Sequence, residues 1–258
     1  MKSCVAGAKK VKMTRRACIT SARDGKKINA DSLVSVIIIA DSPATRMRSY
    51  GPCGLLNVKN TKLIDLQIGE IKKKIKNFEI IICTGFESEK INRYVRNKYK
   101  SLNIRVVENQ GYDNSNSCES LRLCLNNTIN KNIVIIDGNL LFSKELLKVQ
   151  ENYKAYTYVQ KNNKTLEVGV NVNENENAEY FCFGASRQWC EVIFINDETY
   201  VESLRKIVSN PDFKRKFIFE ALNVFINNKS TIKILESKTS IQKINNIKVY
   251  HTIKDNKK

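Results

Sequence analysis

Short apolar runs alternate with segments of helical periodicity between residues 33 and 137, and this alternation constrains the fold more than any other feature. Runs rich in isoleucine and valine at 34–40, 79–83, 104–108 and 133–136 have the length of buried strands. Helical spacing is found between them, at 61–76, 88–99 and 118–126. Strands joined by helices favour parallel pairing with right-handed crossovers. The sequence therefore predicts an α/β fold with a Rossmann-like, mainly parallel sheet flanked by helices.

The pattern changes after Tyr153. We expect strands at 155–160, 166–172 and 179–183, followed by helices at 198–208 and 213–227. The polar segment 173–177 is typical of a turn between two strands. The C-terminal half is therefore predicted to extend the same sheet with antiparallel strands.

Residues 1–32 are predicted to form a flexible basic arm ahead of one domain at 33–258. The arm carries only Asp24 and Asp31 as acids, and the whole chain has a net charge of +18. Such a charge favours an acidic protein or nucleic acid as partner, although lysines spread over a solvated surface explain it equally well. The basic residues of the arm are Lys2, Lys9, Lys10, Lys12, Arg15, Arg16, Arg23, Lys26 and Lys27.

The chain contains no apolar run long enough to span a membrane and no apolar stretch that reads as a signal peptide. Its eight cysteines are scattered, and neither their spacing nor the single His251 matches a zinc site. These features predict an intracellular protein, in the cytoplasm or in a virion, with no membrane association.

Five segments in order resemble the sugar-nucleotide and phosphocholine nucleotidyltransferases. That family opens with a strand, then A-A-G-x-G-x-R-M and P-K-x-L-L-P-V, where this chain has A-D-S-P-A-T-R-M at 40–47 and P-C-G-L-L-N-V at 52–58. The resemblance continues at 79–86, 116–123 and 135–142. It implies a nucleotidyltransferase or GT-A-like fold.

The resemblance also implies a site. Arg46 matches the phosphate-binding arginine of the family, and Asp137 is a candidate Mg²⁺ ligand beside Asn139, which stands at the family's metal-binding aspartate. The positions that match nucleotide-binding positions are Ala40, Asp41, Ser42, Ala44, Thr45, Gly85 and Asn116.

Several catalytic features of the family are altered together. Ser42 and Ala44 replace two loop glycines, and Pro43 between them removes a backbone donor from a phosphate cradle. Cys53 replaces the catalytic lysine, and residues 244–250 contain no acid where the family often supplies a second carboxylate. We therefore expect a catalytically inactive protein that needs no cofactor and serves as a structural or assembly component, for example of a virus or phage particle.

Two other functions fit the sequence. The first is an active, Mg²⁺-dependent enzyme that transfers a nucleotidyl group from CTP or UTP to a sugar phosphate or phosphocholine, with Arg46, Lys59, Asp137 and Asp41 in altered roles. The second is nucleic-acid binding through Tyr94 and Tyr99, which lie among cations.

Trp189 has two readings: an interface anchor, or a side chain of the core or a pocket wall. The second is favoured.

Overall fold

The computed structural model of the protein describes residues 33–43, 46–161, 167–239 and 241–255. The basic arm predicted at residues 1–32 lies outside the described residues, as do Ala44 and Thr45. No helix within the described ranges combines the length and apolar character needed to cross a bilayer.

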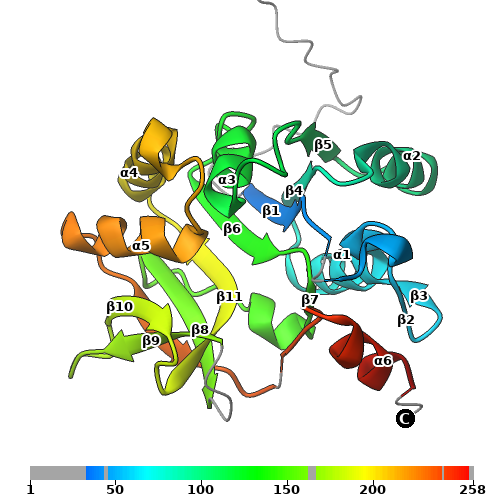
Figure 1. The fold of residues 1–258 in the computed structure, drawn as a ribbon. Helices are drawn as coiled ribbons and strands as arrows, with labels where there is room; N and C mark the ends of the chain where they lie inside the picture. Colours follow the sequence, from blue (N-terminus) through cyan, green and yellow to red (C-terminus); the bar gives the residue numbers. More distant parts are fainter. Residues whose placement is uncertain (1–32, 44–45, 162–166, 240, 256–258) are drawn as a thin grey trace, which may run out of the picture.

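The first half of the chain forms the parallel part of a sheet that has nine strands within the described residues. β1 (Val34–Ala40) lies between β6 (Asn132–Asp137) and β4 (Phe78–Thr84), and β5 (Ile104–Glu108) lies beyond β4. All four strands are parallel, so their carboxyl ends meet at one edge (Figure 1). This confirms the mainly parallel sheet predicted from the sequence.

The second half extends this sheet with antiparallel strands, as predicted. β11 (Arg187–Ile195) pairs antiparallel with β6 and so joins the two halves. β8 (Ala155–Lys161) and β9 (Val168–Val172) both pair with β11. β10 (Ala178–Phe183) pairs with β9 at the edge, and β12 (Lys233–Glu236) pairs in parallel with β8.

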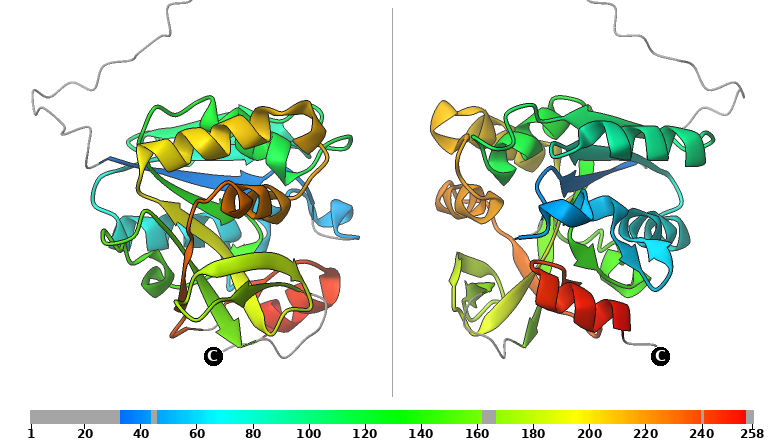
Figure 2. Two further views of the ribbon diagram at one scale, coloured as in Figure 1. Left: turned by 90° about the vertical axis from the view of Figure 1, so that its left-hand side faces the viewer. Right: turned by 45° about the vertical axis from the view of Figure 1, so that its right-hand side comes forward.

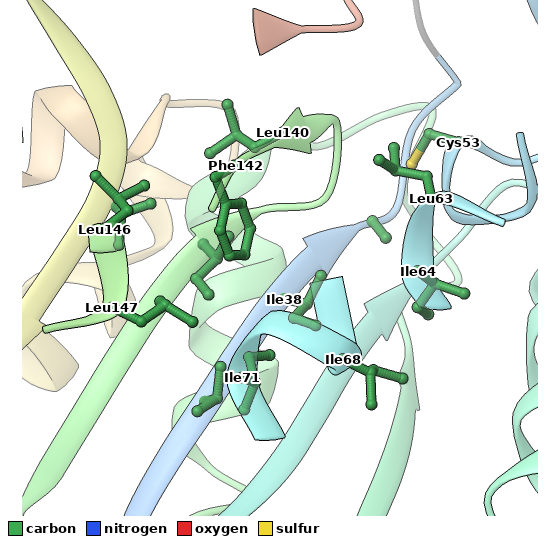
Figure 3. Close-up of a cluster of buried hydrophobic side chains, with 14 of the residues drawn as sticks. Ile38, Cys53, Leu63, Ile64, Ile68, Ile71, Leu140, Phe142, Leu146 and Leu147 are labelled. Carbon is green, nitrogen blue, oxygen red and sulfur yellow. The ribbon is translucent and has the colours of Figure 1, made fainter. Parts of the chain in front are cut away.

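Two helical layers cover the sheet. Alternate residues of β1 point to opposite faces, so that Ile38 contributes to one hydrophobic cluster and Ile37 to the other. The first cluster includes buried residues of α1 (Leu63–Lys74), α2 (Ser88–Lys98) and α6 (Ile247–Asp255). Figure 3 shows Ile64, Ile68 and Ile71 of α1 in this cluster with Ile38.

The opposite face is covered by α3 (Ser117–Leu125), α4 (Glu198–Ser209) and α5 (Ile218–Asn227). Figure 2 shows α4 and α5 from the side on which they lie. Both faces of the central strands are therefore buried, which explains why their sequences read as continuous apolar runs.

Short elements connect these layers. Two of them matter for the site: β7 (Leu140–Leu141) follows β6, and β13 (Gln242–Lys243) pairs antiparallel with it. The others are β2 (Asn57–Val58), β3 (Thr61–Lys62) and the 3₁₀ helices Arg48–Tyr50, Cys53–Leu55, Lys144–Leu147 and Pro211–Phe213.

The helix predicted at 213–227 begins only at Ile218. Pro211 starts a separate 3₁₀ turn, and the Glu220 carboxylate accepts a hydrogen bond of 2.8 Å from the backbone N–H of Phe217, which fixes the start of α5. The residues between the turn and α5 instead contact the start of α3, because the Lys214 carbonyl accepts the Asn116 N–H.

Candidate functional site

A cavity of about 230 Å³ opens at the carboxyl ends of β1 and β6. Ligands of open α/β sheets bind outside the carboxyl ends of the parallel strands, so the cavity lies where a functional site is expected. Its lining residues from the two strand ends are Ile39, Asp41, Ser42, Ile135, Asp137 and Asn139. The other side is formed by Asn116 and Ser117 at the start of α3, by residues of β11 and by the start of α5.

Asp41 is buried and hydrogen-bonded at the end of β1. The residue is 6% exposed, and its carboxylate accepts a hydrogen bond from the Ser120 hydroxyl of α3. The Asn109 side chain donates to Ser120 over 2.9 Å, and the Phe86 N–H donates to the Asp41 carbonyl over 2.7 Å. Burial raises the pKa of Asp41, and the hydroxyl hydrogen bonds oppose that rise. Asp41 therefore ties β1 to α3 and to the loop before it.

Asp137, Glu191 and Lys243 form an ion cluster in the wall of the cavity. The Lys243 ammonium lies 2.6 and 2.7 Å from the two carboxylate oxygens of Glu191 and 3.2 Å from Oδ2 of Asp137. The Asn139 N–H donates to Oδ1 of Asp137 over 2.8 Å. One ammonium thus contacts both carboxyl groups, although its single positive charge balances only one negative charge.

Strand pairing explains why these three residues meet. Val192 of β11 faces Ile136 of β6, so the adjacent residues Glu191 and Asp137 lie next to each other at the strand end. The pairing of β11 with β8 shifts register between Trp189 and Ile193, and within this bulge Glu191 has φ of +52°. Lys243 lies beside these two residues because β13, to which it belongs, pairs with β7, the strand that follows Asp137.

The cluster shifts the pKa values of its members. Burial, and then the nearby Asp137 carboxylate, raises the pKa of Glu191 to about 8. Burial opposes the ionisation of Asp137, but the Lys243 charge and the hydrogen bonds from Glu191 and Asn139 lower its pKa overall. Burial likewise opposes the charge of Lys243, yet the two carboxylates raise its pKa above the ordinary value. Lys243 is therefore a permanent cation at neutral pH.

The side chains of this cluster and of Asn139 do not form a suitable binding site for Mg²⁺. The ammonium of Lys243 already contacts both carboxyl groups, and Asn139 offers a neutral amide. The Oδ1 atom of that amide is buried and has no hydrogen-bond partner among the described residues, but as a neutral ligand it supplies no charge to offset that of Mg²⁺. Within the described ranges no group of three histidine, cysteine or acidic residues is placed to hold a metal ion.

The cavity contains five of the positions that the resemblance singled out: Asp41, Ser42, Asn116, Asp137 and Asn139. Asn116 also caps α3, because its side chain accepts the Ser117 N–H. The structure brings these positions together although they come from three separate segments of the chain.

Other sequence-predicted positions lie elsewhere. Arg46 is exposed, has φ of +60° and does not line the cavity, and exposed Lys59 lies in the turn between β2 and β3. Ala40 is buried in the first core cluster. Cys53 is 1% exposed beside Leu63 (Figure 3), and burial raises the pKa of its thiol, so an uncharged core residue stands where the family has its lysine.

Gly85 has no open space above it. A Cβ atom at this position would lie 2.5 Å from Cβ of Tyr112 and 2.6 Å from the carbonyl oxygen of Asp41. The Tyr112 ring packs edge-on against Phe86, with centroids 6.3 Å apart. Gly85 therefore permits close packing of the loop before α3 onto the strand ends.

Tyr94 and Tyr99 are not arranged as stacking platforms for bases. Their hydroxyls donate to the Asp65 carboxylate over 2.6 and 2.5 Å, and both rings pack against the first core cluster. Lys98 lies over both rings and also contacts Asp65. These aromatic residues anchor α2 to α1.

Sequence reasoning missed Glu191 and Lys243. Glu191 could have been found, because an acid inside the apolar run at 189–195 is unusual enough to indicate a functional residue. The sequence around Lys243 gives no indication that this lysine lies beside Asp137. Trp189 lines the cavity, is 7% exposed, and donates from Nε1 to the Thr157 hydroxyl over 2.8 Å. It therefore belongs to the core and the pocket wall, as favoured from the sequence.

Neither a family model nor a curated protein sequence matches the chain. Solved structures do match. The CTP:phosphocholine cytidylyltransferase from Streptococcus pneumoniae has a TM-score of 0.71 at 20% identity, over 86% of this chain and 98% of that one. The inositol-1-phosphate CTP transferase from T. maritima has a TM-score of 0.66 at 15% identity, over 86% and 95%.

A nucleoside-diphosphate-sugar pyrophosphorylase from Vibrio cholerae has a TM-score of 0.67 at 12% identity, over 85% of this chain and 98% of that one. Each of these structures is matched over nearly its whole length at low sequence identity, so the matches show a shared fold. The order of parallel strands, the antiparallel extension and these matches together lead to one conclusion: the chain has a nucleotidyltransferase-like fold.

Proposed function

We propose that the chain is a catalytically inactive nucleotidyltransferase-like protein that serves as a structural or assembly component. In this proposal the basic arm and surface bind an acidic protein or nucleic acid, and the chain is a subunit of a larger particle, such as a virus or phage. The observation that carries the proposal is the position of Lys243, whose ammonium contacts both Asp137 and Glu191.

An ammonium at this place opposes metal binding. A divalent ion and an ammonium about 4 Å apart repel each other by roughly 8 kcal/mol at an effective dielectric constant of about 20. Lys243 already balances the charge of Asp137, and Glu191, with a pKa of about 8, is mostly protonated at neutral pH, so neither carboxyl group is left to compensate this repulsion. Nucleotidyl transfer by the enzymes that the sequence resembles relies on a metal ion to neutralise phosphate charge, so this cluster argues for loss of the reaction.

Three further features support the proposal. Pro43 in the first loop lacks a backbone donor, Cys53 is buried in the core, and Arg46 is exposed outside the cavity lining. A cavity of about 230 Å³ is also smaller than the roughly 300–1,000 Å³ that is usual for pockets that bind drug-sized ligands.

The test is a pyrophosphate-release assay on the full chain, with CTP or UTP, Mg²⁺, and either phosphocholine or a sugar 1-phosphate. We expect release no faster than in the same mixture with the Asp137→Asn variant. Mg²⁺-dependent release that disappears in Asp137→Asn and in Arg46→Ala would instead support the active nucleotidyltransferase.

A further inference from the structure

Aromatic side chains form the rim of the cavity and remain exposed there. Phe183 of β10 is 60% exposed and Phe217, just before α5, is 46% exposed. The Phe219 ring stacks on Phe217 with centroids 5.7 Å apart and meets Phe183 edge-on at 5.4 Å. A cluster of exposed aromatic residues at the mouth of a cavity is a mark of a binding site.

The cavity lining holds more acids than bases although the protein is basic, but Glu191 is mostly protonated at neutral pH and Asp137 is paired with Lys243, which leaves buried Asp41 and Glu167. Four of its lining residues are acids, Asp41, Asp137, Glu167 and Glu191, and Lys243 is the single base in the described lining. Glu167 accepts a hydrogen bond of 3.0 Å from the Asn245 side chain. Among the described residues, Glu167 has no lysine or arginine within ion-pair distance, so its charge is free to bind a cation.

Carboxylates beside aromatic faces select organic cations. An ammonium or guanidinium group gains from the ring faces and from charge-assisted hydrogen bonds to carboxylates. The small volume of the cavity suits a single long side chain better than a nucleotide.

The chain itself contains a source of such cations. Residues 1–32 carry nine lysines and arginines against two aspartates. A segment of this length spans on the order of 100 Å when extended, whereas β1, which separates its end from the cavity, spans roughly 23 Å. We propose that the cavity binds a lysine side chain of this basic arm, from the same or a neighbouring molecule.

This binding goes beyond the proposed function, because an inactive scaffold does not require an occupied cavity. Its readout involves no nucleotide. Failure of the arm to bind would leave the question of catalysis untouched, and an active enzyme would leave the arm to be tested separately.

The experiment is zero-length carbodiimide cross-linking of the full chain, with the linked peptides identified by mass spectrometry. Carbodiimide joins a carboxylate to an amine that touches it. We expect Glu167 to form more links to arm lysines than Glu174 does, although Glu174 is the more exposed carboxylate and does not line the cavity. Mixing labelled and unlabelled protein shows which molecule supplies the lysine, and either origin supports the proposal.

A matched pair of variants tests the aromatic rim. Phe183 and Tyr180 both lie on β10 and are 60% and 51% exposed, but only Phe183 lines the cavity. Phe183→Ala should reduce the arm links to Glu167 about two- to five-fold, and Tyr180→Ala should leave them unchanged. Circular dichroism verifies that both variants are folded.

Two results would overturn the proposal. One is a yield of arm links at Glu174 equal to or above that at Glu167, which would mean that the arm samples exposed carboxylates at random. The other is an equal effect of Phe183→Ala and Tyr180→Ala on the links at Glu167.

Discussion

Replacing Lys243 with methionine probes the ion cluster directly, because methionine keeps much of the side-chain length and removes the charge. Without the ammonium, the neighbouring carboxyl groups of Asp137 and Glu191 lose the cation that contacts both of them. Removing one partner of a fully buried ion pair typically costs about 3–5 kcal/mol. The Lys243 side chain is 25% exposed, so solvent screens part of this cost and we expect a loss of about 2–3 kcal/mol at pH 8.

The loss should be smaller at pH 6, because protonation of Glu191 then relieves the repulsion between the carboxylates. The free energy of unfolding can be measured by urea titration, read by fluorescence of Trp189, the single tryptophan. Lys238→Met is the control, since Lys238 is exposed and outside the cavity lining.

Mg²⁺ should stabilise Lys243→Met but not the unmodified protein, since removal of the ammonium leaves two carboxylates that bind a divalent cation. A loss below about 0.5 kcal/mol, or an equal response of both proteins to Mg²⁺, would refute the assignment of Lys243 as the cation that neutralises this site.

Three further predictions concern other charges and contacts. The pKa of Glu191 is raised to about 8, so the folded state keeps a proton that the unfolded state releases above a pH of about 4. The free energy of unfolding should therefore fall as pH rises from about 5 to 8. In Glu191→Gln, which cannot lose this proton, the urea midpoint should fall less over the same range. Burial opposes the ionisation of Asp65, but hydrogen bonds from Lys98, Tyr94 and Tyr99 lower its pKa, so its stabilisation is present above a pH of about 4 and is lost in acid. Asp65→Asn should therefore cost about 1–3 kcal/mol at pH 7 and little at low pH, and equal losses at both would contradict this account. Gly85→Ala should destabilise the protein by about 1–3 kcal/mol because its Cβ would overlap Tyr112. Gly69→Ala in α1 should stabilise it by up to about 1 kcal/mol, because an added Cβ would meet no described atom outside the local helix backbone within 4 Å. Thermal melts would show shifts of opposite sign.

The parallel half of the fold was predictable because each of its strands carries its own local signal. The runs at 34–40 and 104–108 have the bounds of β1 and β5. β1 is covered on both faces and is almost entirely apolar, whereas β5 is a partly exposed edge strand in which Arg105 and Glu108 stand beside apolar residues. β11 was not predicted, although it joins the two halves of the sheet. The apolar pattern of β11 is interrupted by Arg187, Gln188 and the bulged Glu191. These polar residues are explained by the pairing of β11 with other strands, which a local sequence pattern does not reveal.

The candidate site was predictable only in part. Asp41, Asn116 and Asp137 came from the family pattern, and the structure places all three at one cavity. Lys243 could not be found in this way, because its position depends on the pairing of a two-residue strand with the segment that follows Asp137. Long-range pairing of short strands leaves almost no trace in local sequence.

Calorimetric titration of the full chain with CTP and with UTP, each with and without Mg²⁺, tests the central claim most directly. With Lys243 in place of a metal ion, the account predicts no binding that Mg²⁺ enhances, up to millimolar nucleotide. Micromolar, Mg²⁺-enhanced binding that is lost in Asp137→Asn would contradict it and would identify the cavity as a working nucleotide site.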